Sequence, residues 1–397
     1  MPAAGCTIVD KRQLAHARVT ARSFAAHDPG IPFFVGLADR VDGAFDPAGE
    51  PFETIEIDAL GLPAGAAMPF RHAADELAYA ITPFLLEHLL DRGFDRVLFF
   101  KRESLVTGSH EPELTLLRSR AIVLTPHLLE PLAGEESARE LGVLLAGTFN
   151  LGFLGVAEAP PARAMLRWWQ ERLREHCRHD VAHGLHFEQR WVDLVPGMFD
   201  GVHIQRDPGA NVGHWSLPER RVEVDGDGVR VDGRPCRLVR FSGYDLDDPG
   251  AATRYDTRLR LDDMGPAAAL FRRYRELVLA AGHAAAAALP YAFGRFDNGV
   301  PVPQLARSLH AGLGARAAAF GDPFATGSPA SFWSWLTGPD EALAPVTRLW
   351  AHVVRSRPDV HAAYAAGGRF DLRGLGGWAR NTGRDEHGIP HEIPLTA

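Results

Sequence analysis

Residues 96–109, RVLFFKRESLVTGS, determine how the rest of the chain is interpreted. The apolar run at 97–100 predicts a buried strand, and this strand is followed by three charged residues, Lys101-Arg102-Glu103. In sheets whose strands alternate with helices, ligands bind beyond the carboxyl ends of the strands. These three residues are therefore the first candidates for a functional site.

The first half of the chain alternates short apolar runs with helical patterns, which predicts an α/β sheet with parallel strands. We expect the strands in CTIVD (6–10), PFFVGLAD (32–39), ETIEIDAL (53–60), RVLFF (96–100), AIVLTPH (121–127) and FNLGFLGV (149–156). We expect the long helices over 13–28, over 74–93 with a break near Pro83, and over 161–178.

The pattern changes in the second half of the chain. The stretch RRVEVDGDGVRVDGRPCRLVRFSG (220–243) predicts a β-hairpin that turns at 225–228, followed by a strand that runs to Phe241. After about residue 262 only helical patterns and turns remain. We therefore expect an α/β domain over residues 1–263 and a mainly helical C-terminal extension over residues 264–397.

Bulk composition excludes several classes of protein. The 397 residues are 46% hydrophobic and 23% charged, and the formal charge of −8 argues against a nucleic-acid-binding protein. No apolar run reaches the roughly 20 residues of a membrane span, and the N-terminus lacks the apolar region of a signal peptide. Three scattered cysteines suit a reducing compartment, so we expect a cytoplasmic protein. Dehydrogenase, hydrolase and ATPase motifs are absent.

Five stretches, in this order, carry a resemblance to a known family: LAHARVTARSF (14–24), RVLFFKRESLVTGS (96–109), FNLGFLGV (149–156), FEQRWVDLVPGMF (187–199) and VRFSGYD (239–245). Over its first 260 or so residues the chain resembles bacterial-type glycosyltransferases of the GT-A fold, nearest in style to family 8, the glycogenin and lipopolysaccharide-galactosyltransferase relatives. The resemblance implies a Rossmann-like mixed sheet flanked by helices. It also implies a hexosyltransferase that moves a sugar from a nucleoside-diphosphate donor to a hydroxyl acceptor with retained stereochemistry.

The chain departs from this family at the metal site. In the family, the two aspartates of an Asp-x-Asp motif and the histidine of a His-x-x-Gly motif hold Mn²⁺ or Mg²⁺. Here these places hold Lys101, Glu103 and Arg240, so no cofactor is firmly predicted and a divalent metal is disfavoured. Two cations replace a dication, and we expect Lys101 and Arg240 to clamp the diphosphate without metal. Glu103 would orient Arg240 or a ribose hydroxyl. The alternative is a site that has lost its function, with these charges on the surface.

The resemblance assigns further residues to the donor. Glu188 and Gln189 would line the reactive face of the donor sugar, or simply begin the next helix. Asn150 and Gly152 would permit close approach to a sugar, or Gly152 would pack against a helix. Asp39 would contact uracil or ribose, or cap a loop, and Gly243 is the glycine of the last motif.

Three more features have competing interpretations. Asp245, Asp247 and Asp248 would offer another metal site, or form a solvated acidic turn. His176, His179 and His183 would share one helical face with metal-compatible spacing, but an exposed histidine-rich helix end is the simpler reading. Trp168, Trp169 and Trp191 belong either to the core or to an acceptor wall. The rival function is a non-catalytic GT-A pseudoenzyme that binds nucleotide sugars or assembles with a true transferase.

Overall fold

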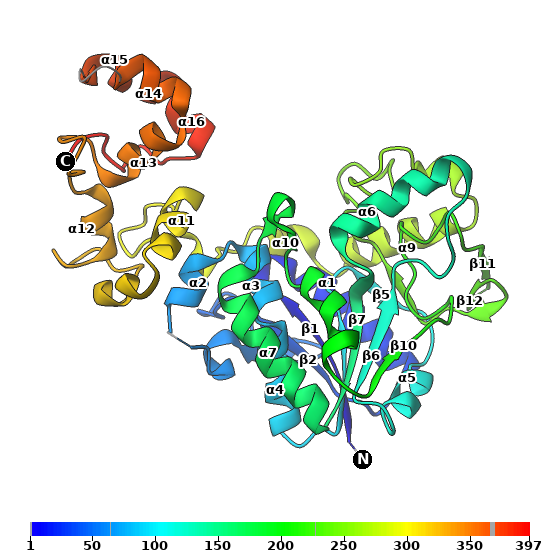
Figure 1. Cartoon of the computed structure of the whole chain (residues 1–397). Helices are drawn as coiled ribbons and strands as arrows, with labels where there is room; N and C mark the ends of the chain where they lie inside the picture. Colours follow the sequence, from blue (N-terminus) through cyan, green and yellow to red (C-terminus); the bar gives the residue numbers. More distant parts are fainter. Residues whose placement is uncertain (1, 64, 227, 366–369) are drawn as a thin grey trace. The chain divides into compact units, whose positions relative to one another are not determined.

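The structure, a computed structural model, describes residues 2–63, 65–226, 228–365 and 370–397. Its central feature is a mixed seven-stranded sheet in the order β10-β6-β7-β4-β1-β2-β3 (Figure 1). The strands are β1 (Ala3–Val9), β2 (Phe33–Leu37), β3 (Glu53–Glu56), β4 (Arg96–Phe100), β6 (Ile122–Pro126), β7 (Phe149–Ala157) and β10 (Val202–Ile204). The predicted fold class, a mixed sheet flanked by helices and followed by a helical region, is confirmed.

The direction of β7 corrects the expectation of parallel strands. β1 pairs in parallel with β2 and β4, but β7 runs antiparallel to both of its neighbours, β4 and β6. An antiparallel strand begins at the edge where its neighbours end, and Phe100 at the end of β4 pairs with Phe153 of β7. The first residues of β7 therefore lie beside the charged residues that follow β4.

Helices cover both faces of the sheet. In β2, Val35 belongs to one apolar core with Phe24 of α1 (Leu14–His27), whereas a Cβ on the next residue, Gly36, would lie 2.9 Å from Leu85 of α4 (Thr82–Asp91). Because successive residues of a strand face opposite sides, α1 and α4 cover opposite faces. α4 packs beside α7 (Pro160–His176) (Figure 1). The other helices of this region are α3 (Ala74–Ala80), α5 (Glu111–Leu116), α6 (Arg139–Ala146) and α8 (Val195–Met198).

Short strands complete the α/β region. β5 (Ser104–Val106) pairs antiparallel with β14 (Leu238–Arg240), with Arg240 opposite Ser104. The predicted hairpin is formed by β11 (Val222–Asp225) and β12 (Gly228–Val231); of its predicted turn, Asp227 lies outside the described residues. β13 (Arg234–Pro235) joins that hairpin, and β8 (His179–Asp180) pairs with β9 (Leu185–His186).

The chain divides into two compact units, residues 1–62 with 75–291 and residues 63–74 with 292–397. This division falls after the expected boundary at 263/264, because α9 (Ala267–Ala280) and α10 (His283–Ala287) pack on the first unit. Tyr274 of α9 stacks on Phe241 with ring centroids 4.0 Å apart. Its hydroxyl lies 2.7 Å from Nδ1 of His16 in α1.

The second unit is helical and has its own apolar core, which contains Phe70, Phe332 and Trp350. The buried Arg307 guanidinium joins its two chain segments by donating hydrogen bonds to the main-chain oxygens of Pro69, Phe70, His72 and Phe293. Its helices are α2 (Ala67–Arg71), α11 (Gln304–Gly312), α12 (Phe332–Thr337), α13 (Arg348–Ser356), α14 (Pro358–Tyr364), α15 (Leu372–Trp378) and α16 (Arg384–His387).

Candidate active site at the carboxyl edge of the sheet

Lys101 is the first residue after β4, and its main-chain N–H donates to the oxygen of Gly152 in β7 (3.0 Å). Its ammonium Nζ lies 2.6 Å from Oε1 of Glu188 and 3.9 Å from the centre of the Tyr79 ring. The Lys101 side chain is 16% exposed and that of Glu188 is 3% exposed. The Lys101 ammonium is therefore held by a carboxylate and an aromatic face.

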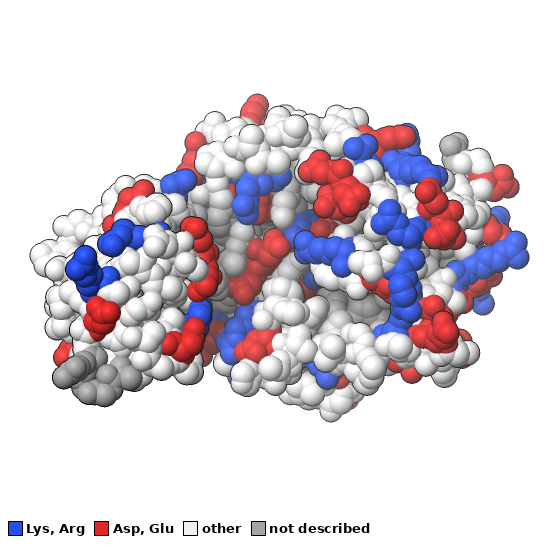
Figure 2. Space-filling model, turned by 90° about the horizontal axis from the view of Figure 1, so that it is seen from above, with Lys and Arg blue, Asp and Glu red and all other residues white. Residues whose placement is uncertain are grey.

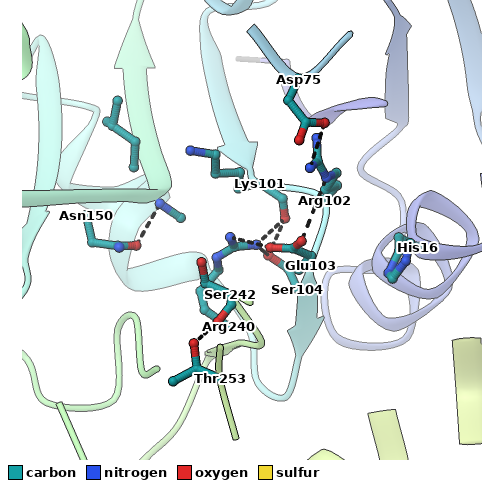
Figure 3. A network of polar contacts seen from close by, with 12 residues as sticks. His16, Asp75, Lys101, Arg102, Glu103, Ser104, Asn150, Arg240, Ser242 and Thr253 are labelled. Atoms are coloured by element: carbon teal, nitrogen blue, oxygen red, sulfur yellow. Dashed lines mark hydrogen bonds and ion pairs between the residues drawn. The ribbon is translucent and has the colours of Figure 1, made fainter. Parts of the chain in front are cut away.

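Arg240, at the end of β14, reaches back to the same loop (Figure 3). Its Nη1 donates to the main-chain oxygen of Lys101 (2.9 Å) and to Oγ of Ser104 (3.1 Å), and its Nη2 lies 3.5 Å from Oε2 of Glu103. Only 2% of its side chain is exposed, against 27% for Glu103. Arg240 therefore supports the Lys101 loop from beneath, and Glu103 occupies one of the two places expected for it, beside this guanidinium.

The charges at this edge balance. Lys101 and Arg240 face Glu188 and Glu103, and Arg102 pairs with Asp75 of α3 at 3.0 Å (Figure 3). Viewed from above, the molecule shows basic and acidic side chains interspersed rather than gathered in patches of one sign (Figure 2). The site has the charge pattern of a local ion-pair network rather than an open basic funnel.

Burial and the ion pairs shift the pKa values of these cations. Burial alone would lower the pKa of Lys101, but the Glu188 carboxylate and the Tyr79 ring outweigh it, so the pKa is raised and the ammonium stays charged. Burial lowers the pKa of Arg240, and Glu103 opposes this shift. Arginine remains protonated in proteins. Both positive charges therefore persist at neutral pH.

Three buried polar atoms at this site have no hydrogen-bond partner within the described chain: Oε2 of Glu188, Nε of Arg240 and Nη1 of Arg102. Leaving a buried polar group unpaired costs about 1–3 kcal/mol. Ligand or ordered water normally satisfies such atoms.

Asn150 and Gln189 lie next to this network, and their side-chain oxygens accept hydrogen bonds from the protein backbone. Gln189 Oε1 accepts from the N–H of Leu151 (3.0 Å), and its Nε2 donates to the oxygen of Ala146 (3.0 Å). Asn150 Oδ1 accepts from the N–H of Gly152 (2.8 Å). A Cβ at Gly152 would lie 2.7 Å from Cδ of Arg240, so this glycine is required for close packing under the arginine.

Two predicted residues have partners elsewhere. The buried Asp39 carboxylate, after β2, accepts from the N–H of Arg40 (2.9 Å) and lies 3.7 Å from Nζ of Lys11. Gly243 has φ +73°, and a Cβ there would lie 2.6 Å from the Tyr255 ring. Asp39 thus binds groups at the end of β2 and near Lys11. Gly243 allows the turn that follows Arg240.

The other candidate metal sites are not formed. The helix that was to align three histidines ends at His176, and His183 lies 2.7 Å from Asp180 in a separate turn. Asp245 Oδ1 accepts from the N–H of Asp247 (2.8 Å), which makes the acidic segment a turn. Nowhere in residues 2–63, 65–226, 228–365 and 370–397 do three histidine, cysteine or acidic side chains gather as metal ligands.

Sequence reasoning missed Asp75 and Tyr79. They are one helical turn apart in α3 and face Arg102 and Lys101 respectively. Their spacing of four residues would have placed them on one helix face, but nothing in the sequence links that face to residues 101–102. Among the tryptophans, Trp169 is buried and donates to the oxygen of Glu188 (3.2 Å), while Trp168 and Trp191 contact each other near the surface.

The fold and the site define an α/β protein with a charged site at the carboxyl edge of a mixed sheet. No family model matches the chain. Two Bacillus subtilis (strain 168) proteins described as uncharacterized are similar to it. YfnF is 25% identical over 261 residues, which are 62% of this chain and 82% of YfnF. YfnD is 25% identical over 175 residues, 43% of this chain and about half (54%) of YfnD.

Solved glycosyltransferase structures are similar in fold. They include the galactosyltransferase LgtC in complex with donor and acceptor sugar analogs (16% identity, 70% of this chain and 95% of that chain, TM-score 0.39). Mouse xyloside xylosyltransferase 1 matches at 10% identity over 55% of this chain and 90% of that chain (TM-score 0.35).

Proposed function

We propose that the first unit is a glycosyltransferase that binds a nucleoside-diphosphate sugar at the carboxyl edge of its sheet and transfers the sugar to a hydroxyl acceptor. The observation that carries the proposal is the meeting of Lys101, Glu188, Glu103 and Arg240, from three distant parts of the chain, with unpaired polar atoms buried among them. The order of the sequence motifs supports the same reaction class.

The divalent metal that the resemblance implies does not fit these residues. An ammonium and a guanidinium occupy two of the three ligand places, and both are charged at neutral pH. Hard divalent cations require oxygen ligands. We therefore propose a metal-independent site in which Lys101 supplies positive charge to the diphosphate and Arg240 fixes the loop that carries Lys101.

Exposure separates the roles of the two cations. Lys101 has the larger exposed fraction and three N–H donors, of which Glu188 uses one, so it is the group that would meet phosphate oxygens. Arg240 is almost fully buried and is committed to the Lys101 oxygen, Ser104 and Glu103. The sequence predicts that both cations contact the diphosphate. We propose instead that Lys101 contacts it and that Arg240 supports the loop of Lys101.

The chemistry expected at this site is a displacement at the anomeric carbon. The bond from that carbon to the diphosphate oxygen breaks, and a bond to the acceptor oxygen forms. The acceptor proton passes to the departing diphosphate, whose negative charge Lys101 stabilises. Glu188, beside Lys101, would stabilise the positive charge that develops on the sugar. Retained stereochemistry remains part of this proposal through the resemblance.

A second function, a non-catalytic nucleotide-sugar binder or assembly partner, is favoured by one observation. Each cation at the site already has a carboxylate partner, so the site is electrically neutral without ligand. In that case the ion pairs would hold the structure together and no sugar would be transferred. We propose a cytoplasmic location for either function, since the three cysteines are unpaired and buried. No helix in the described ranges is both long and apolar enough to cross a bilayer.

Titration calorimetry with UDP, GDP and their sugar conjugates tests the proposal. It should be run in EDTA and again with Mn²⁺, on the wild type, Lys101→Ala and the control Arg118→Ala, whose exposed partner is Glu111. We expect binding in EDTA, a loss of about 10–100-fold for Lys101→Ala and little change for the control. Absence of binding under all conditions would overturn the proposal. Binding without turnover over a panel of sugar acceptors would select the non-catalytic function.

A further inference from the structure

The start of β7 is held by side chains where its ladder with β6 is interrupted. The pairing register shifts between Leu124 and Pro126, and proline has no N–H to offer. In this interval the N–H groups of Leu151 and Gly152 donate to the side-chain oxygens of Gln189 and Asn150. Two amide side chains thus take the place of strand partners.

The orientation of the Asn150 amide follows from its partners, and Figure 3 shows the contact that its side-chain oxygen makes. Its Oδ1 accepts from Gly152 and from Nδ2 of Asn211 (3.0 Å). Its Nδ2 is therefore the end that faces Nε2 of His127, at 3.0 Å. Because an amide nitrogen only donates, Nε2 of His127 must accept, and the imidazole must be neutral with its proton on Nδ1. This Nδ1 is buried and has no hydrogen-bond partner among the described residues, so the contact through Nε2 fixes the tautomer.

We propose that His127 and Asn211 are positioning residues for the site. The neutral imidazole fixes the Asn150 amide, which holds the Gly152 backbone in the close packing that places Arg240 and the Lys101 loop. The expected effect on donor binding rests on the proposed function. The tautomer of His127 and the contacts of Asn150 do not depend on that function.

Gly152 connects the Asn150 amide to Lys101 and Arg240. Its N–H is bound by Asn150, and its oxygen accepts from the N–H of Lys101 (3.0 Å). Its α-carbon lies against Arg240, whose Cγ would be 2.8 Å from a Cβ at this position. A turned Asn150 amide would release the Gly152 N–H and loosen this packing.

The surroundings of His127 keep it neutral. Burial lowers its pKa to about 4, against the opposing effect of the main-chain groups of Gly147 and Thr148. His186, Lys101, His214 and Arg220 are basic neighbours of this ring, while Glu219 pairs with Arg220 and Glu188 with Lys101. Trp215 packs edge-on against the His127 ring. A pH of about 4 would therefore be needed to protonate the imidazole and remove its acceptor.

Nitrogen-15 NMR of the histidine side chains, with His127 assigned from His127→Gln, tests the inference directly. We expect the Nδ1-protonated tautomer at neutral pH, with protonation only near pH 4. Calorimetry with UDP and GDP should show a loss of about tenfold or more for His127→Phe and for Asn211→Ala, and near wild-type affinity for His127→Gln, whose Oε1 replaces the acceptor. Circular dichroism and melting curves should show that all three variants fold.

An Nε2-protonated His127, a pKa near 6.5, or full affinity in His127→Phe would overturn the inference. If the wild type binds neither nucleotide, the proposed function fails. In that event the tautomer still decides the inference, because an Nε2-protonated ring contradicts the network whatever the protein binds.

Discussion

Lys101 and Glu188 stand 87 residues apart in the chain and form an ion pair of 2.6 Å, with the lysine ammonium also over the ring of Tyr79. The pair joins the loop after β4 to the segment before η6 (Arg190–Leu194). From the sequence, Lys101 was expected to stand in for a metal ligand. In the structure it is the cationic member of an ion pair with Glu188. Arg240 and Glu103 form a longer ion pair, with 3.5 Å between Nη2 and Oε2.

Glu188→Gln should destabilise the first unit, because it leaves the Lys101 ammonium without its charge partner. Removing one member of a buried pair costs about 3–5 kcal/mol, and the partial exposure of Lys101 favours the lower end. Urea denaturation measures the change. Glu111→Gln, in the exposed pair with Arg118, is the control and should cost about 0–1 kcal/mol. Equal losses in the two variants would show that the Lys101–Glu188 pair does not stabilise the fold.

Acid should destabilise the first unit at a pH set by its buried histidines. Burial lowers the pKa of His16, His127 and His186 to about 4, whereas an unfolded histidine titrates near 6.5. The unfolded state binds more protons below pH 6.5, so this stability is present above that pH and lost as the pH falls towards 4.

The histidine contribution is measured by the pH dependence of the free energy of unfolding. Each such histidine contributes a slope of up to about 1.4 kcal/mol per pH unit in this window. His127→Gln removes one titrating group, so it should reduce this slope by up to about 1.4 kcal/mol per pH unit. An unchanged slope in that variant would mean that His127 does not titrate abnormally.

Gly152→Ala should destabilise the first unit and weaken donor binding. A Cβ at this position would lie 2.5 Å from Oδ1 of Asn150 and 2.7 Å from Cδ of Arg240. Overpacking of this kind costs about 1–3 kcal/mol. Gly142→Ala in α6 is the matched control, because nothing lies within 4 Å of its Cβ, and it should be neutral or stabilising. Melting temperatures decide the comparison, and equal effects would contradict the predicted packing.

Arg307→Met should release the segment 63–74 from the second unit. The substitution leaves the main-chain oxygens of Pro69, Phe70, His72 and Phe293 without their shared donor. We expect a loss of at least about 3 kcal/mol and faster proteolysis within residues 63–74. Arg295→Met, which removes one exposed hydrogen bond, serves as control. A cleavage pattern identical to that of the control would rule out this role for Arg307.

Much of the fold is predictable from local patterns. The apolar runs predict strands from the centre to the edges of the sheet. Pro83 correctly predicts the break between α3 and α4. The antiparallel direction of β7 is not predictable from its composition, because a strand buried on both faces has no alternation that would reveal it. The packing of α9 on the first unit depends on Tyr274 meeting Phe241 and His16, contacts between residues far apart in sequence.

The site is predictable in position but not in its pairings. Lys101 and Glu103 were expected to follow one strand and Arg240 to lie in another, and in the structure the three residues are in contact. The partnership of Lys101 with Glu188 escaped prediction because it depends on where the β8–β9 turn directs the chain. Asn150 and Gln189 look like ligand groups in a sequence, yet the interrupted ladder of β7 occupies their amides.

The most direct test of the central claim uses the scarcity of lysine in this chain. Lys11 and Lys101 are its only lysines, so methylation with carbon-13 formaldehyde gives few NMR signals, and Lys101→Arg identifies the one that matters. In EDTA, saturation with UDP or GDP should shift the Lys101 signal while that of Lys11 stays in place. A nucleotide that binds without moving the Lys101 signal, or moves it only after Mn²⁺ is added, would contradict a diphosphate held by this lysine in place of a metal.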